Sequence, residues 1–457
     1  MKDVITVVGA GYVGLTAASV IASAGYKTNL IDVDERKIEI IKRGRSHFFE
    51  AGLDKLVKSG IDSENLIPTT EFDSLKETDI LFSCVGTPDR EDGSSNLDYI
   101  FQVADKVAHI SSGEIIYVQK STVPVGTGKK IKKYIASKNS DLKVKYVSNP
   151  EFLREGSAVY DTIFFDRLVI GGEDLEAMSK VEKVFKDVDE WAKKYESNGY
   201  GDYVLYASHP DDSGLPFEEK TIKINIESAE LVKVTSNAFL ALKISFANNI
   251  AKVADKTGAN VKEVFDAVGM DRRINRSFLY PGLGWGGGCF PKDVSGLTKA
   301  GEELGLNMKI LKEAYEENRS MVDYVADRVI SISPKNKEVG ILGLSFKPGT
   351  SDVRKSPAIA LVKKLLDKGF KVTVNDPEAF EEAKHELGES VIYEDDPKKV
   401  IENHEIVVIA TDWKVYKDTD WSKINRSKLK YVLDARNCSD KKDVESNGLE
   451  YIGIGVN

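Results

Sequence analysis

Apolar and polar positions alternate in blocks along the first part of the chain. The run "VITVV" (residues 4–8) predicts a buried strand, and "LTAASVIASAG" (15–25) then has the three- and four-residue spacing of a helix that ends at Gly25. A second apolar run, "KTNLIDVD" (27–34), completes a strand–helix–strand unit, and further strand-like runs follow it. Short buried strands that alternate with helices are typical of a parallel sheet covered on both faces.

One long helix is predicted from Glu227 onward. The segment has no glycine or proline for about 30 residues, small and apolar side chains recur at helical spacing, and Gly258 ends the pattern. A helix of this length is expected to connect two sheet domains and to form a dimer contact. The small side chains that would let another helix approach closely are Ala238, Ala241, Ser245 and Ala251.

The opening pattern returns near Lys337. Strand, glycine turn, helix, strand and terminal acid follow in the same order over residues 337–377. We therefore expect an α/β fold with two Rossmann-like parallel-sheet domains, joined by the long helix and a small helical domain. The expected domains are a first Rossmann-like domain (1–220), a central helical domain with the cysteine loop (221–330) and a second Rossmann-like domain (331–457). The turn-rich stretch from Asn198 to Pro216 predicts a hairpin or an extended excursion.

Composition restricts the classes of function. The chain has 457 residues, enough for two or three domains, and a net charge of -9, which argues against nucleic acid or an anionic membrane as the main partner. No apolar run approaches the roughly 20 residues that span a bilayer, and the amino-terminal segment does not resemble a signal peptide. Three scattered cysteines fit a reducing, cytoplasmic compartment, and the five histidines show no metal-ligand spacing.

The first glycine turn predicts a dinucleotide site. Gly9, Gly11 and Gly14 form G-x-G-x-x-G between a strand and a helix, where glycines permit a tight turn and close approach of a pyrophosphate. Asp32 ends the next strand, and a carboxylate there binds the ribose hydroxyls and repels a 2′-phosphate, which favours NAD over NADP. The alternative is a glycine turn that only packs strand on helix. The second turn, at Gly343, lacks the third glycine, so NAD is not expected there.

The segment "GLGWGGGCFPKD" (282–293) is the candidate for covalent chemistry. Its glycines are expected to leave the backbone at Cys289 accessible to a bulky ligand, and free N–H groups there could stabilise an oxyanion. Cys84 lies in an apolar strand and Cys438 beside a polar loop, so both are expected to be structural.

Other candidate groups have ordinary alternatives. Lys233 and Asn237 share one face of the long helix, and they could equally be a solvated lysine and a surface amide. In isolation, Glu151 and Glu155 of "NPEFLREG" are typical of acids that open a helix.

Seven segments together resemble the nucleotide-sugar dehydrogenase family, which includes the UDP-glucose and GDP-mannose dehydrogenases. They fall in the family's order and span almost the whole chain: "GAGYVG", "STVPVGT", "NPEFLREGSA", "ELVKVTSNAFLALKIS", "MDRRINRSFLYPGLGWGGGCFPKD", "LGLSFKPGTSDVRKSPA" and "LDAR". The resemblance implies an NAD-dependent, two-step, four-electron oxidation of a sugar alcohol to a carboxylate. A cysteine is needed because a covalent thiohemiacetal can itself lose a hydride and become a thioester.

The resemblance assigns catalytic roles to six residues. Cys289 corresponds to the nucleophile, and Lys233 to the lysine that stabilises alkoxide and oxyanion charge. Asn237 corresponds to a partner at the substrate oxygen. Asp293 and Thr122 correspond to a pair that holds a water or moves protons, and Glu151 corresponds to the general base for thioester hydrolysis.

Binding positions follow from the same resemblance. The expected cofactor contacts are Gly9, Gly11, Tyr12, Val13, Gly14, Asp32, Lys37, Thr87, Ser121, Thr122, Glu155, Lys292 and Arg354. The expected nucleotide-sugar contacts are Glu151, Phe152, Leu153, Lys233, Asn237, Phe278, Tyr280, Gly282, Gly286, Phe290, Phe346, Lys347 and Arg436. Arg273 matches an arginine that reaches the substrate from a neighbouring subunit, which implies a homodimer or a higher homo-oligomer.

The sequence departs from the family pattern at two places. Gly288 stands where family members commonly have serine, and the Asn198–Pro216 excursion is longer than usual. Phe290 and the "FLYPG" run favour UDP-glucose, oxidised to UDP-glucuronate, over GDP-mannose or UDP-N-acetylmannosamine. A non-catalytic sensor of NAD and nucleotide sugar, or a simple two-electron alcohol dehydrogenase, are the alternatives from other classes.

Overall fold

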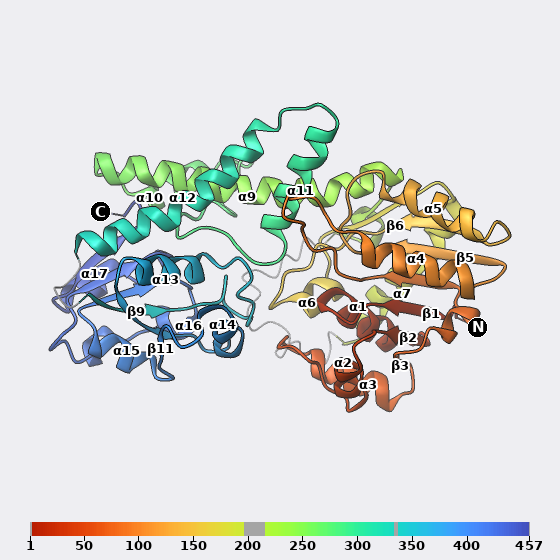
Figure 1. Ribbon diagram of the computed structural model, residues 1–457, viewed down its shortest axis with the longest axis horizontal. Coiled ribbons are helices and arrows are strands. Elements are labelled where there is room, and N and C mark those ends of the chain that lie inside the picture. The colour runs from red at the N-terminus through yellow and green to blue at the C-terminus, as the bar shows by residue number, and fades with distance from the viewer. Residues whose placement is uncertain (1, 196–214, 333–336, 457) are drawn as a thin grey trace. The chain divides into compact units, whose positions relative to one another are not determined.

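The computed structural model describes residues 2–195, 215–332 and 337–456 (Figure 1). The chain forms two compact units, Met1–Thr235 and Ser236–Asn457, and each is described by itself. The predicted excursion at Asn198–Pro216 lies, except for its last two residues, outside the described residues. None of the helices in the described ranges is both long and apolar enough to cross a lipid bilayer.

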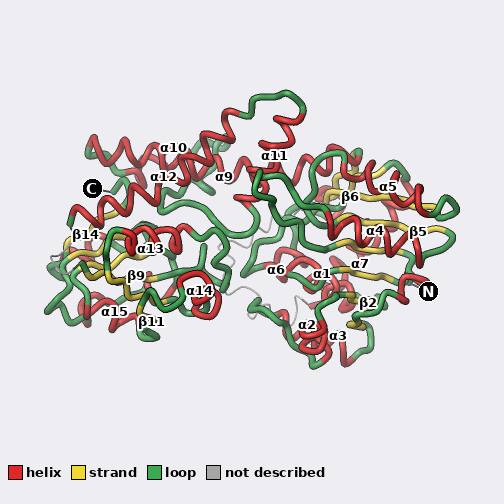
Figure 2. The backbone as a smooth tube through the Cα atoms, in the orientation of Figure 1, coloured by secondary structure: helices red, strands yellow, loops and turns green. Residues whose placement is uncertain are grey.

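The first unit is built on a sheet with the strand order β3-β2-β1-β4-β5-β6-β7-β8. Figure 2 labels β2, β5 and β6 of this sheet, with helices around them. Strands β1 to β6 are parallel in the 3-2-1-4-5-6 order of a Rossmann-like fold, whereas β7 is antiparallel to β6. The four residues of β1 are all buried, as expected for a strand covered on both faces. The strands are β1 (Ile5–Val8), β2 (Thr28–Ile31), β3 (Leu66–Thr69), β4 (Ile80–Ser83), β5 (Glu114–Gln119), β6 (Lys143–Ser148), β7 (Leu168–Gly172) and β8 (Thr221–Ile224).

Two apolar cores lie on the two faces of this sheet. Helices α1, α3 and α7 contribute to one core, and helices α4 and α5 to the other. The helices of the unit are α1 (Tyr12–Ser23), α2 (Glu35–Lys42), α3 (Leu53–Asp62), α4 (Asp98–Ile110), α5 (Thr127–Lys138), α6 (Ala158–Ile163), α7 (Leu175–Tyr195) and α8 (Phe217–Lys220), with the 3-10 helix η1 (Asp73–Glu77).

Helix α9 (Ile226–Thr257) confirms the predicted long helix. It ends before Gly258, whose φ of +76° is the left-handed conformation that stops a helix. Its small residues Ala238 and Ala241 pack in a core with Trp285 and Val294 of the same unit. The close approach that these small side chains permit is therefore used within the chain.

The second unit repeats the Rossmann-like arrangement, as predicted. Its sheet is parallel throughout the described strands, in the order β11-β10-β9-β12-β13-β14. The strands are β9 (Glu338–Leu342), β10 (Lys371–Asn375), β11 (Ile392–Tyr393), β12 (Ile406–Ile409), β13 (Tyr431–Asp434) and β14 (Glu450–Gly453). The helices after α9 are α10 (Val261–Gly269), α11 (Phe290–Glu303), α12 (Lys309–Ser331), α13 (Pro357–Asp367), α14 (Phe380–Leu387), α15 (Pro397–Asn403), α16 (Lys414–Lys417) and α17 (Lys441–Ser446), with the 3-10 helix η3 (Trp421–Lys423).

Several helices of this unit begin where the sequence supplies a cap. Ser356 accepts a hydrogen bond from the N–H of Ala358 and precedes Pro357, the first residue of α13. Asp396 and Pro397 start α15 in the same way. Helix α11 differs, because Cys289 occupies its N-cap and its side chain makes no capping hydrogen bond.

Candidate active site

The three glycines of the first turn are required for three different reasons. Gly9 has a φ of +101°, and a Cβ there would lie 2.8 Å from the carbonyl oxygen of Cys84 at the end of β4. A Cβ at Gly14 would collide with the Gly9 carbonyl oxygen, so this glycine lets α1 pack on the turn. A Cβ at Gly11 would meet nothing within 4 Å, which leaves open space beside the start of α1. A pyrophosphate fits that space, because the first N–H groups and the dipole of a helix attract anions.

Asp32 is fixed beside the same turn. Its Oδ2 accepts a hydrogen bond from the N–H of Ala10 (2.7 Å), and its Oδ1 accepts one from the N–H of Asp34 (3.0 Å). The ammonium of Lys37 lies 3.8 Å from Oδ2. The carboxylate therefore stands at the carboxyl end of β2, where a bound dinucleotide places its ribose.

Three further predicted cofactor contacts, Thr87, Ser121 and Thr122, lie on loops at the ends of β4 and β5. The hydroxyl of Thr87 donates to the Thr122 carbonyl (2.9 Å), and the hydroxyl of Ser121 donates to the Val85 carbonyl (2.7 Å). These bonds tie the two loops together. They lie at the carboxyl ends of parallel strands, the edge at which open α/β sheets bind ligands.

The equivalent turn of the second unit is filled by its own chain. Asp376 follows β10 as Asp32 follows β2, and its Oδ2 accepts hydrogen bonds from the N–H groups of Leu344 (2.7 Å) and Ser345 (3.0 Å). The indole N–H of Trp413 also donates to this oxygen (3.2 Å). A buried carboxylate with this many donors does not offer an acceptor to ribose, which agrees with the expectation that NAD does not bind there.

Glu151 and Lys233 form a buried ion pair in the first unit. Lys233 Nζ lies 2.9 Å from Glu151 Oε1, and Glu151 Oε2 accepts a hydrogen bond from the N–H of Leu153 (2.8 Å). The Lys233 ammonium also lies 5.5 Å from the centre of the Phe152 ring. The alternative that Lys233 is a solvated surface residue is therefore wrong, since only 3% of the residue is exposed.

Lys120 is a buried ammonium that sequence reasoning missed. It is 6% exposed, and its Nζ donates to Asn149 Oδ1 (3.0 Å). Burial lowers the pKa of Lys120, the Lys233 charge lowers it further, and Cys84 and Glu151 act in the opposite direction. Lys120 directly follows β5, and this position alone does not distinguish a buried lysine from an exposed one in the sequence.

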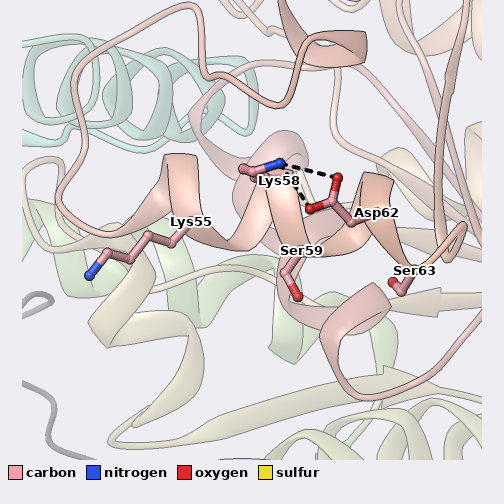
Figure 3. A pocket seen from close by; sticks show the side chains of 5 residues that line it. All are labelled: Lys55, Lys58, Ser59, Asp62 and Ser63. Carbon is pink, nitrogen blue, oxygen red and sulfur yellow. Dashed lines mark hydrogen bonds and ion pairs between the residues drawn. The ribbon is translucent and has the colours of Figure 1, made fainter.

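A cavity of about 50 Å³ lies beside this cluster. Lys120, Glu151, Phe152 and Arg167 are among its lining residues. A second, shallow depression runs along α3 and is lined by exposed residues, including Lys58 and Asp62, which form an ion pair of 2.9 Å (Figure 3). The α3 depression contains no predicted site residue.

In the second unit, the loop before Cys289 is anchored from several sides. The guanidinium of Arg436 donates to the carbonyl oxygens of Gly284 (3.0 Å), Phe346 (3.2 Å) and Ala410 (2.7 Å). The N–H of Gly282 donates to Asn248 Oδ1 (2.7 Å). Arg436, predicted as a substrate contact, thus also fastens the loop to the second sheet.

The glycines next to Cys289 are covered, contrary to the expectation that they leave the backbone accessible. A Cβ at Gly286 would collide with the Lys355 carbonyl oxygen, and one at Gly287 would lie 2.8 Å from the Phe346 ring. A Cβ at Gly288 would lie 2.7 Å from the guanidinium of Arg354. Residues 346–355 therefore occupy the space that side chains at 286–288 would fill.

Cys289 itself is exposed, and a polar network follows it in α11. Asp293, one helical turn further in α11, accepts hydrogen bonds from the Asn237 amide (2.6 Å) and the Lys292 ammonium (2.6 Å). The start of a helix favours a negative charge, so a thiolate or an oxyanion is stabilised at this position.

The other predicted positions are placed as follows. Phe278 has a φ of +64°, and its ring centre lies 6.3 Å from that of Phe290. Tyr280 is exposed and lies under the Arg276 guanidinium (4.8 Å). Arg273 is exposed and paired with Asp271 (2.6 Å). The Lys347 ammonium lies 5.5 Å from the Phe346 ring centre. The ring of Tyr12 lies 4.0 Å from that of Phe48, centre to centre, in a tilted arrangement, whereas Val13 and Glu155 are half-buried.

Neither of the other cysteines shares this setting. Cys84 is buried beneath the first glycine turn, and burial raises the pKa of its thiol to about 12. Burial also raises the pKa of the Cys438 thiol, which donates to Asp434 Oδ1 (3.7 Å). Neutral thiols at both positions leave Cys289 as the candidate nucleophile. Across the described ranges, no group of three or more histidine, cysteine, aspartate or glutamate side chains could hold a metal ion.

The sequence matches the three successive domains of one family. Residues 3–189 match the NAD binding domain of the UDP-glucose/GDP-mannose dehydrogenase family, residues 227–320 its central domain and residues 340–441 its UDP binding domain. The chain belongs to this family. The resemblance drawn from the motifs is confirmed, and so is NAD as the cofactor.

Individual relatives support the same assignment. The chain is 36% identical to UDP-glucose 6-dehydrogenase TuaD of Bacillus subtilis, with 99% of this chain and 93% of the relative covered. It is also 36% identical to UDP-glucose 6-dehydrogenase of Rhizobium meliloti, with 99% of both covered. A solved UDP-glucose dehydrogenase from Pyrobaculum islandicum superposes with a TM-score of 0.88 at 35% identity, covering 100% of this chain and 98% of that chain.

Removal of the Asp32 carboxylate is expected to weaken NAD binding. A hydrogen bond to a charged group contributes about 1.5–3 kcal/mol, so Asp32→Ala should raise the NAD dissociation constant roughly 10- to 100-fold. The variant should also prefer NAD over NADP less strongly than wild type does. Fluorescence titration measures the dissociation constants of NAD and of NADP. Asp34→Ala is the matched control, because Asp34 only caps α2, and it should change NAD affinity less than about twofold while costing about 1 kcal/mol of stability. Equal losses in the two variants would contradict the role of Asp32.

Gly288→Ser is expected to displace the Arg354 guanidinium. The side chain of Arg354 is flexible, so it should move before the loop backbone does. The effects of Gly288→Ser and Arg354→Ala on kcat/KM should therefore be non-additive, with a coupling of about 1 kcal/mol in a double-mutant cycle. Additive effects would show that the two positions act separately.

Proposed function

We propose that this protein catalyses the NAD-dependent, four-electron oxidation of UDP-glucose to UDP-glucuronate. The observation that carries the proposal is an exposed thiol, Cys289, at the start of α11 beside the Asn237–Asp293–Lys292 network. A binding protein or a two-electron dehydrogenase has no chemical need for such a thiol. The relatives named as UDP-glucose 6-dehydrogenases favour glucose as the sugar.

The residues of the first turn fit NAD. Open space at Gly11 and the fixed carboxylate of Asp32 would hold the pyrophosphate and the ribose, with Thr87, Ser121 and Thr122 on the neighbouring loops. NAD, when bound, supplies the hydride acceptor of each oxidation.

The two oxidations are connected by the thiol. The C6 alcohol loses a hydride and a proton and becomes an aldehyde, and Cys289 Sγ then forms a C–S bond to that carbon. The resulting thiohemiacetal loses a second hydride and a proton and becomes a thioester. Lys233 is proposed to stabilise negative charge on the oxygen through its ammonium. Asn237, whose amide donates to Asp293 (2.6 Å), is proposed to be the partner at that oxygen.

Thioester hydrolysis completes the reaction. Glu151 is proposed to remove a proton from water, which attacks the acyl carbon and releases the Cys289 thiolate. The second unit is proposed to bind the nucleotide through the Phe346–Lys347 segment, Arg436 and the aromatic residues around Phe278. Arg354 is proposed to contact the cofactor, and the three domains are taken as residues 1–220, 221–330 and 331–457.

A homodimer that acts in the cytoplasm is part of the proposal. Phe239, Phe246 and Val253 recur every seven residues on α9 and are 60%, 52% and 55% exposed. Large apolar side chains aligned on one helix face mark a protein interface. A second copy of this chain fits them, because the same stripe on two helices is self-complementary. Arg273, exposed on the loop after α10, would then serve the partner's site.

Stoichiometry tests the chemistry. Wild-type protein should release two NADH for each UDP-glucose consumed, with UDP-glucuronate as the product, as measured by absorbance and chromatography. Cys289→Ser should yield at most one NADH per sugar, since it cannot form the thioester. GDP-mannose and UDP-N-acetylmannosamine serve as comparison substrates.

Three results would contradict this proposal. An unchanged NADH yield in Cys289→Ser would remove the covalent step. Free aldehyde with one NADH from wild type would indicate a two-electron dehydrogenase. No NADH with any of the three nucleotide sugars would favour a sensor.

Phe246→Asp tests the dimer. A charge in the middle of the α9 stripe should convert a dimer to a monomer at micromolar concentration, as measured by light scattering. Leu175→Asp places the same charge at an exposed leucine of α7 and should leave the mass unchanged. A monomeric wild type, or a dimeric Phe246→Asp protein, would contradict the assignment.

A further inference from the structure

Lys120 is costly to bury and has no role in the chemistry described so far. Its ammonium donates to the neutral amide of Asn149 (3.0 Å) and lies 5.0 Å from the centre of the Phe185 ring. Asn149 is itself fully buried and donates to the Val169 carbonyl (2.9 Å). A buried charge that rests on a neutral amide and a ring destabilises the fold relative to an apolar side chain of the same size.

Burial makes the proton of Lys120 easier to remove than that of an exposed lysine. Glu151 and Lys233 are 9% and 3% exposed, so two ammonium groups share the surroundings of one carboxylate. Lys233 is paired directly with Glu151 at 2.9 Å. Lys120 is held by an amide instead. Burial lowers its pKa and the Lys233 charge lowers it further, whereas Cys84 and Glu151 raise it, so Lys120 is the group of the cluster that holds its proton less tightly than an exposed lysine does.

The cavity of about 50 Å³ connects Lys120 with Glu151. Both residues line it, and its volume exceeds the 10–15 Å³ or so that one water requires. Its other charged lining residues are Arg154, Asp161, Asp166 and Arg167. Arg154 is paired with Asp161 (2.6 Å), and the Arg167 guanidinium lies 3.9 Å from the Phe152 ring centre. Water in this space can carry a proton between the carboxylate and the amine.

We propose that Lys120 is a positioning residue that acts through Glu151 by accepting, across water in this cavity, the proton that Glu151 removes during thioester hydrolysis. The inference rests on the proposed function. In this step, water forms a C–O bond to the acyl carbon, the C–S bond breaks and the Cys289 thiolate leaves. One proton passes from water to the Glu151 carboxylate and then to the Lys120 amine, which becomes an ammonium and later releases this proton to solvent. The other proton of the water stays on the product carboxyl group, which loses it to solvent. No oxidation or reduction occurs, and Glu151 returns to the charged form that the next turnover requires.

The test separates charge from proton transfer. Lys120→Arg keeps the positive charge but does not release its proton, whereas Lys120→Met removes both. Rapid-quench experiments follow NADH by absorbance and UDP-glucuronate by chromatography in one turnover. In both variants we expect NADH to form within about threefold of the wild-type rate and hydrolysis to slow about 100-fold, the size of a lost proton-transfer partner.

The control is Phe185→Leu, which removes the ring contact of Lys120 but leaves the amine in place. It should hydrolyse the thioester within about threefold of wild type. The pH profile gives a readout that a structural role would not change. Wild-type hydrolysis should rise with pH as Lys120 loses its proton, and Lys120→Arg should lose this rise.

Wild type alone provides a measurement that does not depend on how the variants fold. A proton inventory of hydrolysis in mixtures of H₂O and D₂O should curve, because more than one proton moves. A linear inventory, or a Lys120→Arg protein that hydrolyses the thioester at the wild-type rate, would overturn the role of Lys120. The proposed function would still stand in that case if wild type releases two NADH per sugar. Equal slowing of hydride transfer and hydrolysis in Lys120→Arg would overturn it as well. Absence of NADH in wild type would defeat the proposed function and the Lys120 inference together.

Discussion

The position of Cys289 in the second unit depends on residues 346–355, which pack closely against the backbone of the loop before it. Phe346, Arg354 and the Lys355 carbonyl occupy the places where side chains at 286–288 would stand. Arg436 adds three hydrogen bonds that join this loop to the second sheet. The loop has little freedom as a result, and the thiol that follows it is held at the N-cap of α11. A reactive group gains most when its position is fixed before the substrate arrives.

The first unit uses a different device, the carboxyl edge of a parallel sheet. The turn after β1, the carboxylate after β2 and the tied loops after β4 and β5 all lie at that edge. Behind them is a cluster of buried charge around Glu151, which stability alone does not explain. Burial lowers the pKa of Lys120 in this cluster. Buried titratable groups with shifted pKa values are typical of sites where protons move.

Local patterns in the sequence predicted much of this, and contacts between distant segments account for the rest. The glycine turn with Asp32 and the uninterrupted run of α9 depend on neighbours in the chain, so the pattern was sufficient. The direction of β7 and the residues that fill Gly286–Gly288 depend on segments far away in sequence, which spacing does not reveal. The glycines were expected to expose the backbone, whereas another part of the chain covers them. Lys120 was overlooked because a lysine after a strand has the same appearance in sequence whether it is buried or exposed.

Mass spectrometry of the protein quenched during turnover with UDP-glucose and NAD tests the central claim most directly. The account predicts a transient acyl adduct on the peptide that contains Cys289, and none on the peptides of Cys84 or Cys438. Steady formation of UDP-glucuronate with Cys289 never modified, or an adduct confined to another cysteine, would contradict it.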